Sequence, residues 1–161
     1  MHTVHIYTDG AAKGNPGPGG YGVVMELVGQ AYRKEFNEGF RLTTNNRMEL
    51  LAVITGLESL KIDGSNVAVY TDSKYVSDAV SKGWVFQWES KAFKKKKNSD
   101  LWVRFLKIYR KHNVRFIWIK GHASIPENEK CDQLAVEASK KSLLLEDTGY
   151  NALDDNPILS L

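Results

Sequence analysis

Three strand-like segments within the first 41 residues most constrain the fold of this chain. The side chains of residues 3–9 alternate between two faces and end at a turn glycine, and residues 21–28 and 31–41 follow with only two residues between them. Residues 14–20 (GNPGPGG) have the composition of a loop. Because none of these connections is long enough for a crossover helix, we expect an antiparallel meander.

The rest of the chain alternates between helical and strand patterns. Residues 66–72 are a continuous apolar run that ends at an acid, which is typical of a buried central strand. Residues 114–119 predict a fifth strand, and residues 84–98 receive no helix or strand assignment. The expected helices span about 46–60 with Thr44 or Asn45 as N-cap, 74–82 capped by Ser73, 99–112, and 127–142. The order βββαβααβα predicts a mixed α/β sheet covered by helices.

Length and charge indicate one domain with an acidic end. A chain of 161 residues is an ordinary single domain. Four of the 19 acidic residues and none of the 22 basic ones lie in residues 146–161, so this segment carries −4 and residues 1–145 carry +7. We therefore expect a domain over residues 1–145 and an acidic tail over residues 146–161. A basic body favours a polyanionic partner.

The cysteine count and the N-terminus bear on the compartment. Cys131 is the single cysteine, so no disulfide framework is possible and a reducing compartment is expected. The first residues do not pair a basic region with an apolar one, and the sequence holds no long apolar run. These features predict a cytoplasmic protein without a membrane partner.

The same three residues end two of the predicted strands. Tyr7-Thr8-Asp9 ends the first strand, and Tyr70-Thr71-Asp72 ends the fourth. Ligands of α/β sheets tend to bind at the carboxyl ends of strands. If these two strands are neighbours, Asp9 and Asp72 lie one strand spacing apart and must share a proton or a cation. The alternative is a pair of turn-capping aspartates.

Glu49 favours the cation. It lies within the almost wholly apolar run of residues 48–54, where a carboxylate is costly unless it is paired. Arg47 is adjacent but leaves the helix on another side, and a buried lysine or arginine partner is the alternative explanation. A divalent cation shared by Asp9, Glu49 and Asp72 is the sharper hypothesis. Ligands that are all oxygen favour Mg²⁺ or Mn²⁺ over zinc.

Two further candidates follow the fifth strand. Asp132 lies beside the inward stripe of the last helix, although an acid there is more often simply solvated. His122 lies in the loop Lys120-Gly-His-Ala123, where an isolated histidine is usually exposed and idle. Near a metal-bound phosphate, a group whose pKa is close to neutral could transfer protons.

Two segments invite a nucleic-acid interpretation. The loop at residues 14–20 lacks the Gly-Lys-Ser/Thr ending of a phosphate-binding loop, so we interpret it as a turn that can bring Asn15 to a substrate. Residues 84–97 interleave aromatic and basic side chains, which favours a nucleic-acid surface over an ordinary solvated face. The aromatic and basic side chains of this segment are Trp84, Phe86, Trp88, Phe93, Lys91, Lys94, Lys95, Lys96 and Lys97.

Taken in order, the motifs resemble those of bacterial ribonuclease HI, the type 1 RNase H family. They are YTDG at 7–10, GNPGPGGYG at 14–22, TTNNRMEL at 43–50, TDS at 71–73, and KGHA with PENEKCD across 120–132. The resemblance covers about residues 3–142, and EDTGY at 146–150 resembles the family's usual ending. It implies an RNase H-like α/β fold with a five-stranded mixed sheet in the order 3-2-1-4-5, its first three strands antiparallel. The implied activity is endonucleolytic hydrolysis of the RNA strand of RNA·DNA hybrids by a monomer.

The resemblance also implies roles for individual residues. Asp9, Glu49, Asp72 and Asp132 would bind two Mg²⁺ ions, or Mn²⁺ as a substitute, with Asp9 bridging both. His122, with Glu129 nearby, would assist product release or proton transfer. The implied substrate groove comprises Gly10, Asn15, Thr44, Asn45 and Asn46, with Gly10 and Asn45 near RNA 2′-hydroxyls and Thr44 near a DNA phosphate.

Two segments depart from the family pattern. The basic segment at residues 84–97 would bind the DNA strand, although it is shorter than in the best-known bacterial members. Lys74 stands where a neutral residue commonly follows the Asp-Ser pair. It either adds a phosphate contact or is surface variation.

Three other functions compete with hydrolysis of hybrids. A duplex-binding module without catalysis would have lost a metal ligand, whereas this chain keeps all four acids. A DNA nuclease or strand transferase on the same fold would lack a reason for the Thr44-Asn45-Asn46 segment with Asn15. An interaction domain with surface acids leaves Glu49 unexplained.

Overall fold

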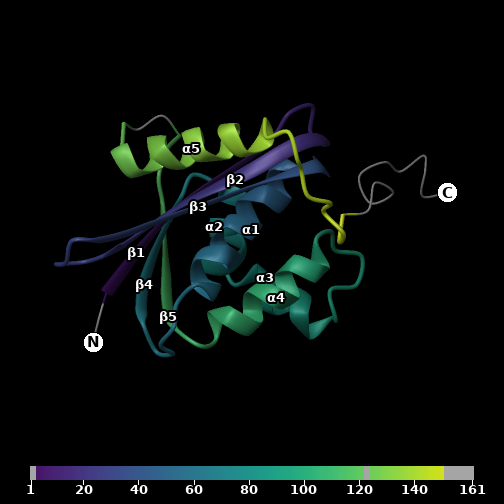
Figure 1. Ribbon diagram of the computed structural model, residues 1–161. Coiled ribbons are helices and arrows are strands. Elements are labelled where there is room, and N and C mark those ends of the chain that lie inside the picture. Colours follow the sequence, from purple (N-terminus) through teal and green to yellow (C-terminus); the bar gives the residue numbers. More distant parts are fainter. Residues whose placement is uncertain (1–2, 122–123, 151–161) are drawn as a thin grey trace.

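A computed structural model of the chain describes residues 3–121 and 124–150. In this described part, five strands form one sheet and five helices cover it (Figure 1). The strands are β1 (Thr3–Ala12), β2 (Gly17–Leu27), β3 (Tyr32–Thr43), β4 (Asn66–Thr71) and β5 (Asn113–Trp118). The helices are α1 (Asn45–Glu58), α2 (Lys74–Ser81), α3 (Trp84–Ser90), α4 (Ser99–Tyr109) and α5 (Pro126–Ser139).

The sheet has the order that the resemblance implies. Its strands lie in the order β3-β2-β1-β4-β5, with β1, β2 and β3 antiparallel to one another. Strand β4 pairs in parallel with both β1 and β5. The expected fold class is therefore confirmed, and the carboxyl ends of β1, β4 and β5 meet at one edge of the sheet.

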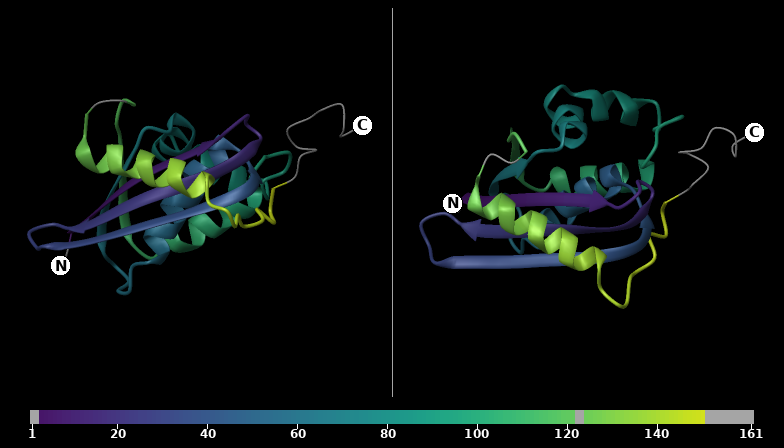
Figure 2. Two further views of the ribbon diagram at one scale, coloured as in Figure 1. Left: turned by 45° about the horizontal axis from the view of Figure 1, so that its top comes forward. Right: turned by 90° about the horizontal axis from the view of Figure 1, so that it is seen from above.

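Helices pack on both faces of the sheet (Figures 1 and 2). Helix α5 lies across β1, β2 and β3 on one face, whereas α1 packs against β1 and β2 on the other and α4 packs on α1. The main core fills the α1 side, where Ile6 and Val23 meet Ile54, Leu57 and the fully buried Trp102. No helix within the described residues is both long and apolar enough to cross a lipid bilayer.

Strand β2 begins earlier than the glycine-rich composition predicts. Residues 17–20 are not a loop, because Gly17 pairs with Thr43 and Gly19 and Gly20 pair with the end of β3. The glycines serve the packing of α5. A Cβ on Gly20 would lie 2.5 Å from the Ala135 carbonyl oxygen, and one on Gly22 would overlap the backbone of the same helix. The strand therefore tolerates glycine because a helix crosses directly over it.

The segment at residues 84–98 contains α3, a helix that the sequence analysis did not assign. Its N-cap residue, Gly83, has a left-handed backbone and makes no side-chain cap bond, so the usual start signal is absent. Val85 is fully buried, and Trp88 packs against the core with its ring 5.7 Å from that of Trp102. Burial of these side chains stabilises the short helix. The lysines that follow it form an irregular loop.

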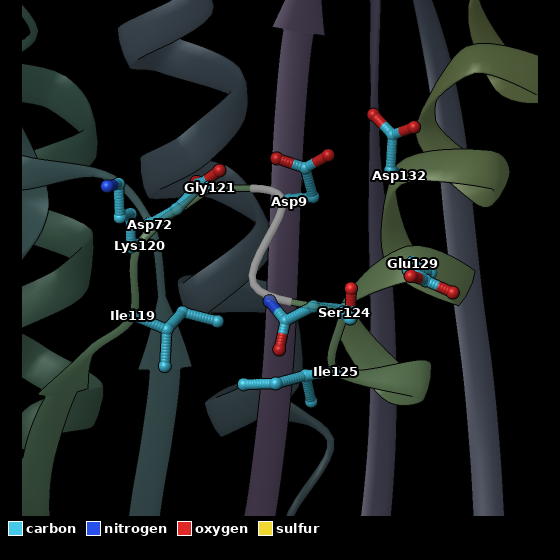
Figure 3. A pocket seen from close by; sticks show the side chains of 10 residues that line it. Asp9, Asp72, Ile119, Lys120, Gly121, Ser124, Ile125, Glu129 and Asp132 are labelled. Atoms are coloured by element: carbon cyan, nitrogen blue, oxygen red, sulfur yellow. The ribbon is translucent and has the colours of Figure 1, made fainter.

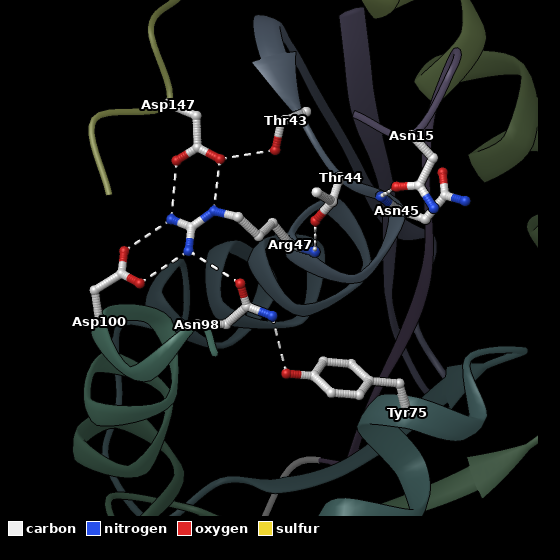
Figure 4. Close-up of polar contacts among 9 residues, drawn as sticks. All are labelled: Asn15, Thr43, Thr44, Asn45, Arg47, Tyr75, Asn98, Asp100 and Asp147. Atoms are coloured by element: carbon white, nitrogen blue, oxygen red, sulfur yellow. Dashed lines mark hydrogen bonds and ion pairs between the residues drawn. The ribbon is translucent and has the colours of Figure 1, made fainter. Parts of the chain in front are cut away.

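After α5 the chain returns to the sheet edge. The Leu145 amide donates to the Gly39 carbonyl at 2.9 Å, and the Arg41 amide donates to the Leu145 carbonyl at 2.8 Å. Leu145 thereby forms a parallel bridge with Phe40 of β3. Residues up to 150 then run past the start of α1 towards α4 (Figures 1 and 4).

Candidate active site

Three carboxylates from three elements meet at the edge where β1 and β4 end. Strands β1 and β4 are parallel neighbours with Tyr7 opposite Tyr70, so Asp9 and Asp72 lie next to each other. The predicted end of the first strand at Asp9 is wrong, because β1 continues along β2 to Ala12. Glu49 reaches the same place from α1. One oxygen from each of the three residues lies within 4.8 Å of the others. The sequence repeat at the two strand ends thus becomes one acidic cluster.

Gly10 allows Glu49 to reach this cluster. A Cβ on Gly10 would overlap the backbone of Met48 and Glu49, so only glycine permits α1 to lie this close to β1. The Gly10 amide donates to Oε1 of Glu49 at 2.7 Å, and the Thr71 hydroxyl donates to Oε2 at 3.4 Å. Glu49 is only 6% exposed. Its hydrogen-bond donors are neutral, which argues against the alternative of a buried lysine or arginine partner.

Asp132 lies on the other side of Asp9, in the second turn of α5 (Figure 3). It is exposed and lines a cavity of about 140 Å³ together with Asp9 and Asp72. Residues 119–121 after β5 and the first turn of α5, including Glu129, complete the wall. Asp9 is therefore the acid between Asp72 and Asp132.

Burial and mutual repulsion disfavour the charged forms of these acids. Burial, together with the charges of Asp72 and Asp132, raises the pKa of Asp9 to about 7, although a hydrogen bond with Glu49 opposes the shift. Burial first, and then the charges of Asp9 and Asp72, raise the pKa of Glu49 well above its ordinary value. A hard divalent cation would remove this penalty, and an all-oxygen donor set fits Mg²⁺ or Mn²⁺.

The sequence of the chain can be compared with the sequence models of known protein families. The sequence model of the RNase H family matches residues 1–140, most of the chain. The chain belongs to the RNase H family. It is therefore an enzyme that hydrolyses phosphodiester bonds, and the resemblance to ribonuclease HI that the motifs indicated is confirmed.

Relatives in the RNase H family match over nearly their whole length. The chain is 57% identical to the ribonuclease H of Desulforamulus reducens over 146 residues, which cover 88% of this chain and 90% of that protein. It is 46% identical to the ribonuclease HI of a Synechocystis species over 154 residues, which cover 92% and 95% of the two chains.

Solved RNase H structures share the fold. A type 1 RNase H with the type 2 active-site motif superposes with a TM-score of 0.78 at 32% identity, covering 86% of this chain and 72% of the other. An RNase H1 crystallised in complex with an RNA/DNA hybrid superposes with a TM-score of 0.64 at 29% identity, covering 84% and 95%.

The predicted groove residues of this RNase H are held together beside the acids. The Asn45 amide donates to Oδ1 of Asn15 at 2.9 Å, and the Ala12 amide donates to Oδ1 of Asn45. Thr44 is the N-cap of α1, because its hydroxyl accepts from the Arg47 amide at 3.2 Å. Backbone contacts thus engage both amide oxygens, and Asn46 is exposed next to them.

The predicted basic residues lie around α2, α3 and the loop after α3. Lys74 is exposed at the first position of α2, and Trp84 is 39% exposed at the start of α3. Trp88, by contrast, is mostly turned into the core, with Lys96 Nζ 5.0 Å from the centre of its ring. The remaining lysines of the set, Lys91, Lys94, Lys95 and Lys97, are exposed.

The structure adds a buried arginine clamp that the sequence analysis missed (Figure 4). Arg47 is 2% exposed and its guanidinium donates to both oxygens of Asp147, at 2.7 and 2.9 Å, and to both oxygens of Asp100, at 2.8 Å. Asn98 accepts a further bond, and the Thr43 hydroxyl donates to Asp147 at 2.7 Å. Arg47 does leave α1 on another side from Glu49, as expected. His122 lies outside the described residues.

Proposed function

We propose that this RNase H cleaves the RNA strand of RNA·DNA hybrids endonucleolytically with two divalent metal ions. The observation that carries the proposal is the convergence of Asp9, Glu49 and Asp72 within 4.8 Å, with Asp132 beside them. A structural relative was solved with an RNA/DNA hybrid, which supports that substrate. A cluster of carboxylates repels a polyanion unless cations bind between them.

Four residues would hold the ions. These are Asp9, Glu49, Asp72 and Asp132, of which Asp9 would be shared between the two ions. Mg²⁺ is the expected ion and Mn²⁺ a substitute, and two such ions stabilise both the attacking and the leaving oxygen of a phosphodiester. The chain contributes rigid placement. Gly10 and Thr71 hydrogen-bond to Glu49, and the paired strands β1 and β4 fix Asp9 and Asp72.

The side-chain amides of Asn15 and Asn45 would recognise the substrate. Because the Oδ1 atoms of Asn15 and Asn45 accept backbone bonds, their NH₂ groups remain available as donors. A donor without charge can hydrogen-bond to a 2′-hydroxyl, the group that distinguishes RNA from DNA. We assign Asn45 and the Gly10 backbone to the RNA strand, and Asn15, Thr44 and Asn46 to the adjoining groove.

The remaining expectations stay part of this proposal. His122, with Glu129 on the cavity wall, would assist product release or proton transfer. Lys74 would contact a phosphate of the nucleic-acid backbone. The DNA strand would be contacted by Trp84, Trp88 and the lysines of residues 91–97. We also propose a cytoplasmic monomer with a domain over residues 1–145 and an acidic segment over residues 146–161.

Cleavage assays with labelled duplexes test the proposal. In Mg²⁺ we expect internal cuts in the RNA strand of an RNA·DNA hybrid, and no cuts in DNA·DNA or RNA·RNA duplexes. Asp9→Asn should abolish turnover while the protein stays folded. Equal cleavage of all three duplexes, or near-normal turnover by Asp9→Asn, would contradict the proposed substrate or the bridging role, respectively.

A further inference from the structure

Trp118 lies next to the acidic edge, the part of the sheet edge where Asp9, Glu49 and Asp72 meet, but it is not one of the acidic residues. It is the last residue of β5, opposite Thr71 of β4, and is 41% exposed. Its indole N–H donates to the Asp72 carbonyl oxygen at 3.0 Å. This bond lies beyond the last strand pair, so the side chain of Trp118 holds the peptide that carries one of the proposed metal ligands.

The face of the Trp118 indole ring contacts Lys74. The Lys74 Nζ atom lies 4.0 Å from the centre of the Trp118 ring, the shortest of the lysine–aromatic contacts among the described residues. A cation over an indole face is attracted by the ring quadrupole. The contact therefore holds an otherwise flexible side chain in one region, two residues beyond Asp72.

Stability does not account for this placement. Lys74 is the first residue of α2, where the helix dipole disfavours a positive charge. Lys74 is exposed, and within the described residues we find no ion pair that includes it. Trp118 leaves 41% of its surface in solvent, so burial explains only part of its placement. Both side chains are better explained by a ligand that approaches the acidic edge and carries negative charge.

We propose that Trp118 is a positioning residue that fixes the Lys74 ammonium beside the acidic edge, where Lys74 binds a phosphate of the strand being cut. The indole serves both neighbours at once, because its N–H bonds to the Asp72 peptide and its face binds the lysine. This inference rests on the proposed function. It assigns to this chain a phosphate contact next to the catalytic carboxylates, with Trp118 as its support.

Hybrid binding as a function of salt tests the proposal. The parent protein is Asp9→Asn, measured in EDTA with a fluorescent RNA·DNA hybrid so that no cleavage occurs. Lys74→Gln should weaken binding and reduce the slope of log K against log salt by about 0.9, the value for one phosphate contact. Trp118→Leu should weaken binding about two- to five-fold. Trp118→Phe keeps an aromatic face and should restore most of that loss.

A double variant with Lys74→Gln and Trp118→Leu tests whether Trp118 acts by positioning Lys74 or through a general effect on the structure. If Trp118 acts through Lys74, Trp118→Leu should cost almost nothing more in a protein that already carries Lys74→Gln. Additive losses would overturn the proposal, as would a Trp118→Phe variant no better than Trp118→Leu. Thermal unfolding of each variant checks the fold, and Lys74→Gln changes only an exposed side chain.

Lys34→Gln is the matched control. Lys34 lies on β3, at the opposite edge of the sheet, with its Nζ 5.8 Å from the centre of the Phe36 ring. Its removal should leave both affinity and salt slope nearly unchanged, and a slope change equal to that of Lys74→Gln would overturn the site assignment. If the parent protein does not bind the hybrid at all, the proposed function fails, independently of Trp118.

Discussion

At the scale of single residues, the acidic cluster combines burial with repulsion. Asp9 lies within β1, Asp72 directly follows β4 and Glu49 is almost fully buried, yet the three have oxygens within 4.8 Å of one another. In the absence of metal, the cluster favours protonated carboxylates at neutral pH. The ionised cluster therefore binds divalent cations favourably and destabilises the metal-free protein.

Asp9→Asn should stabilise the metal-free protein in a pH-dependent way. The pKa of Asp9 is raised from 3.8 to about 7, so between these values the folded state holds more protons than the unfolded state and stability falls as pH rises. The variant lacks this penalty. At pH 8 in EDTA it should unfold with a free energy about 1–3 kcal/mol higher than wild type, and the gap should close towards pH 4. Equal urea midpoints at pH 8 would contradict the shift.

Metal binding should release protons in the same pH range. Below about pH 7 Asp9 is protonated in a substantial fraction of molecules, and an ion can bind only to the carboxylate. Titration calorimetry in buffers of different ionisation enthalpy should show proton release on Mg²⁺ binding at pH 6 and much less at pH 8.5. The apparent affinity should rise across this interval. Proton release that does not vary with pH would show that the acids are ionised before the metal arrives.

The residue scale is also where the sequence was most informative. Repeated Tyr-Thr-Asp strand ends and an acid inside an apolar helix pointed to Asp9, Asp72 and Glu49 before any fold was known. Trp118 gave no such signal, because its role depends on two contacts that only the pairing of β4 with β5 creates.

At the scale of elements, α1 is the part that connects the acids to the rest of the molecule. Its first turn carries the Thr44 cap, Glu49 lies one turn further, and Arg47 between them enters the clamp with Asp100 and Asp147. One helix start is thereby fixed to α4 and to the segment that follows α5. No local pattern could predict the clamp, since its partners are 53 and 100 residues away in sequence.

Asp147→Ala should be strongly destabilising. Asp147 is 8% exposed at its side chain, and its removal leaves the buried Arg47 with one carboxylate fewer, so we expect a loss of about 2–4 kcal/mol in urea unfolding. Glu146→Ala is the matched control, because the Arg41–Glu146 pair is 65% exposed at both side chains and should contribute less than about 1 kcal/mol. If the two variants lost similar amounts of unfolding free energy, the buried clamp would contribute no more to stability than an exposed ion pair.

Two elements escaped prediction for reasons of packing. The glycines of β2 predicted a loop because local composition does not show that α5 crosses over Gly20 and Gly22. Helix α3 begins without a side-chain cap, and only the burial of Val85 and Trp88 in a distant core reveals it. The order of the strands, by contrast, came from the family resemblance and was confirmed.

At the scale of the whole molecule, charge is divided between a basic loop and an acidic edge. The exposed lysines after α3 follow the backbone turns at Ala92, Phe93 and Lys95, which have positive φ angles. The lysines of this loop are exposed, as contact with phosphates would require.

Replacing Lys94, Lys95, Lys96 and Lys97 by alanine should weaken hybrid binding and flatten its salt dependence. Each lost phosphate contact should reduce the slope of log K against log salt by about 0.9. Because these side chains are exposed, thermal stability should change little. An unchanged slope would count against the basic loop as a nucleic-acid contact.

The arginine clamp has a consequence for how the protein is made. Asp147 and Leu145 belong to the segment that leaves the ribosome after every strand and helix of the described fold. A nascent chain therefore carries Arg47 with Asp100 but without Asp147 until residue 147 has been synthesised, so up to that point α1 is joined to α4 but not to the segment after α5.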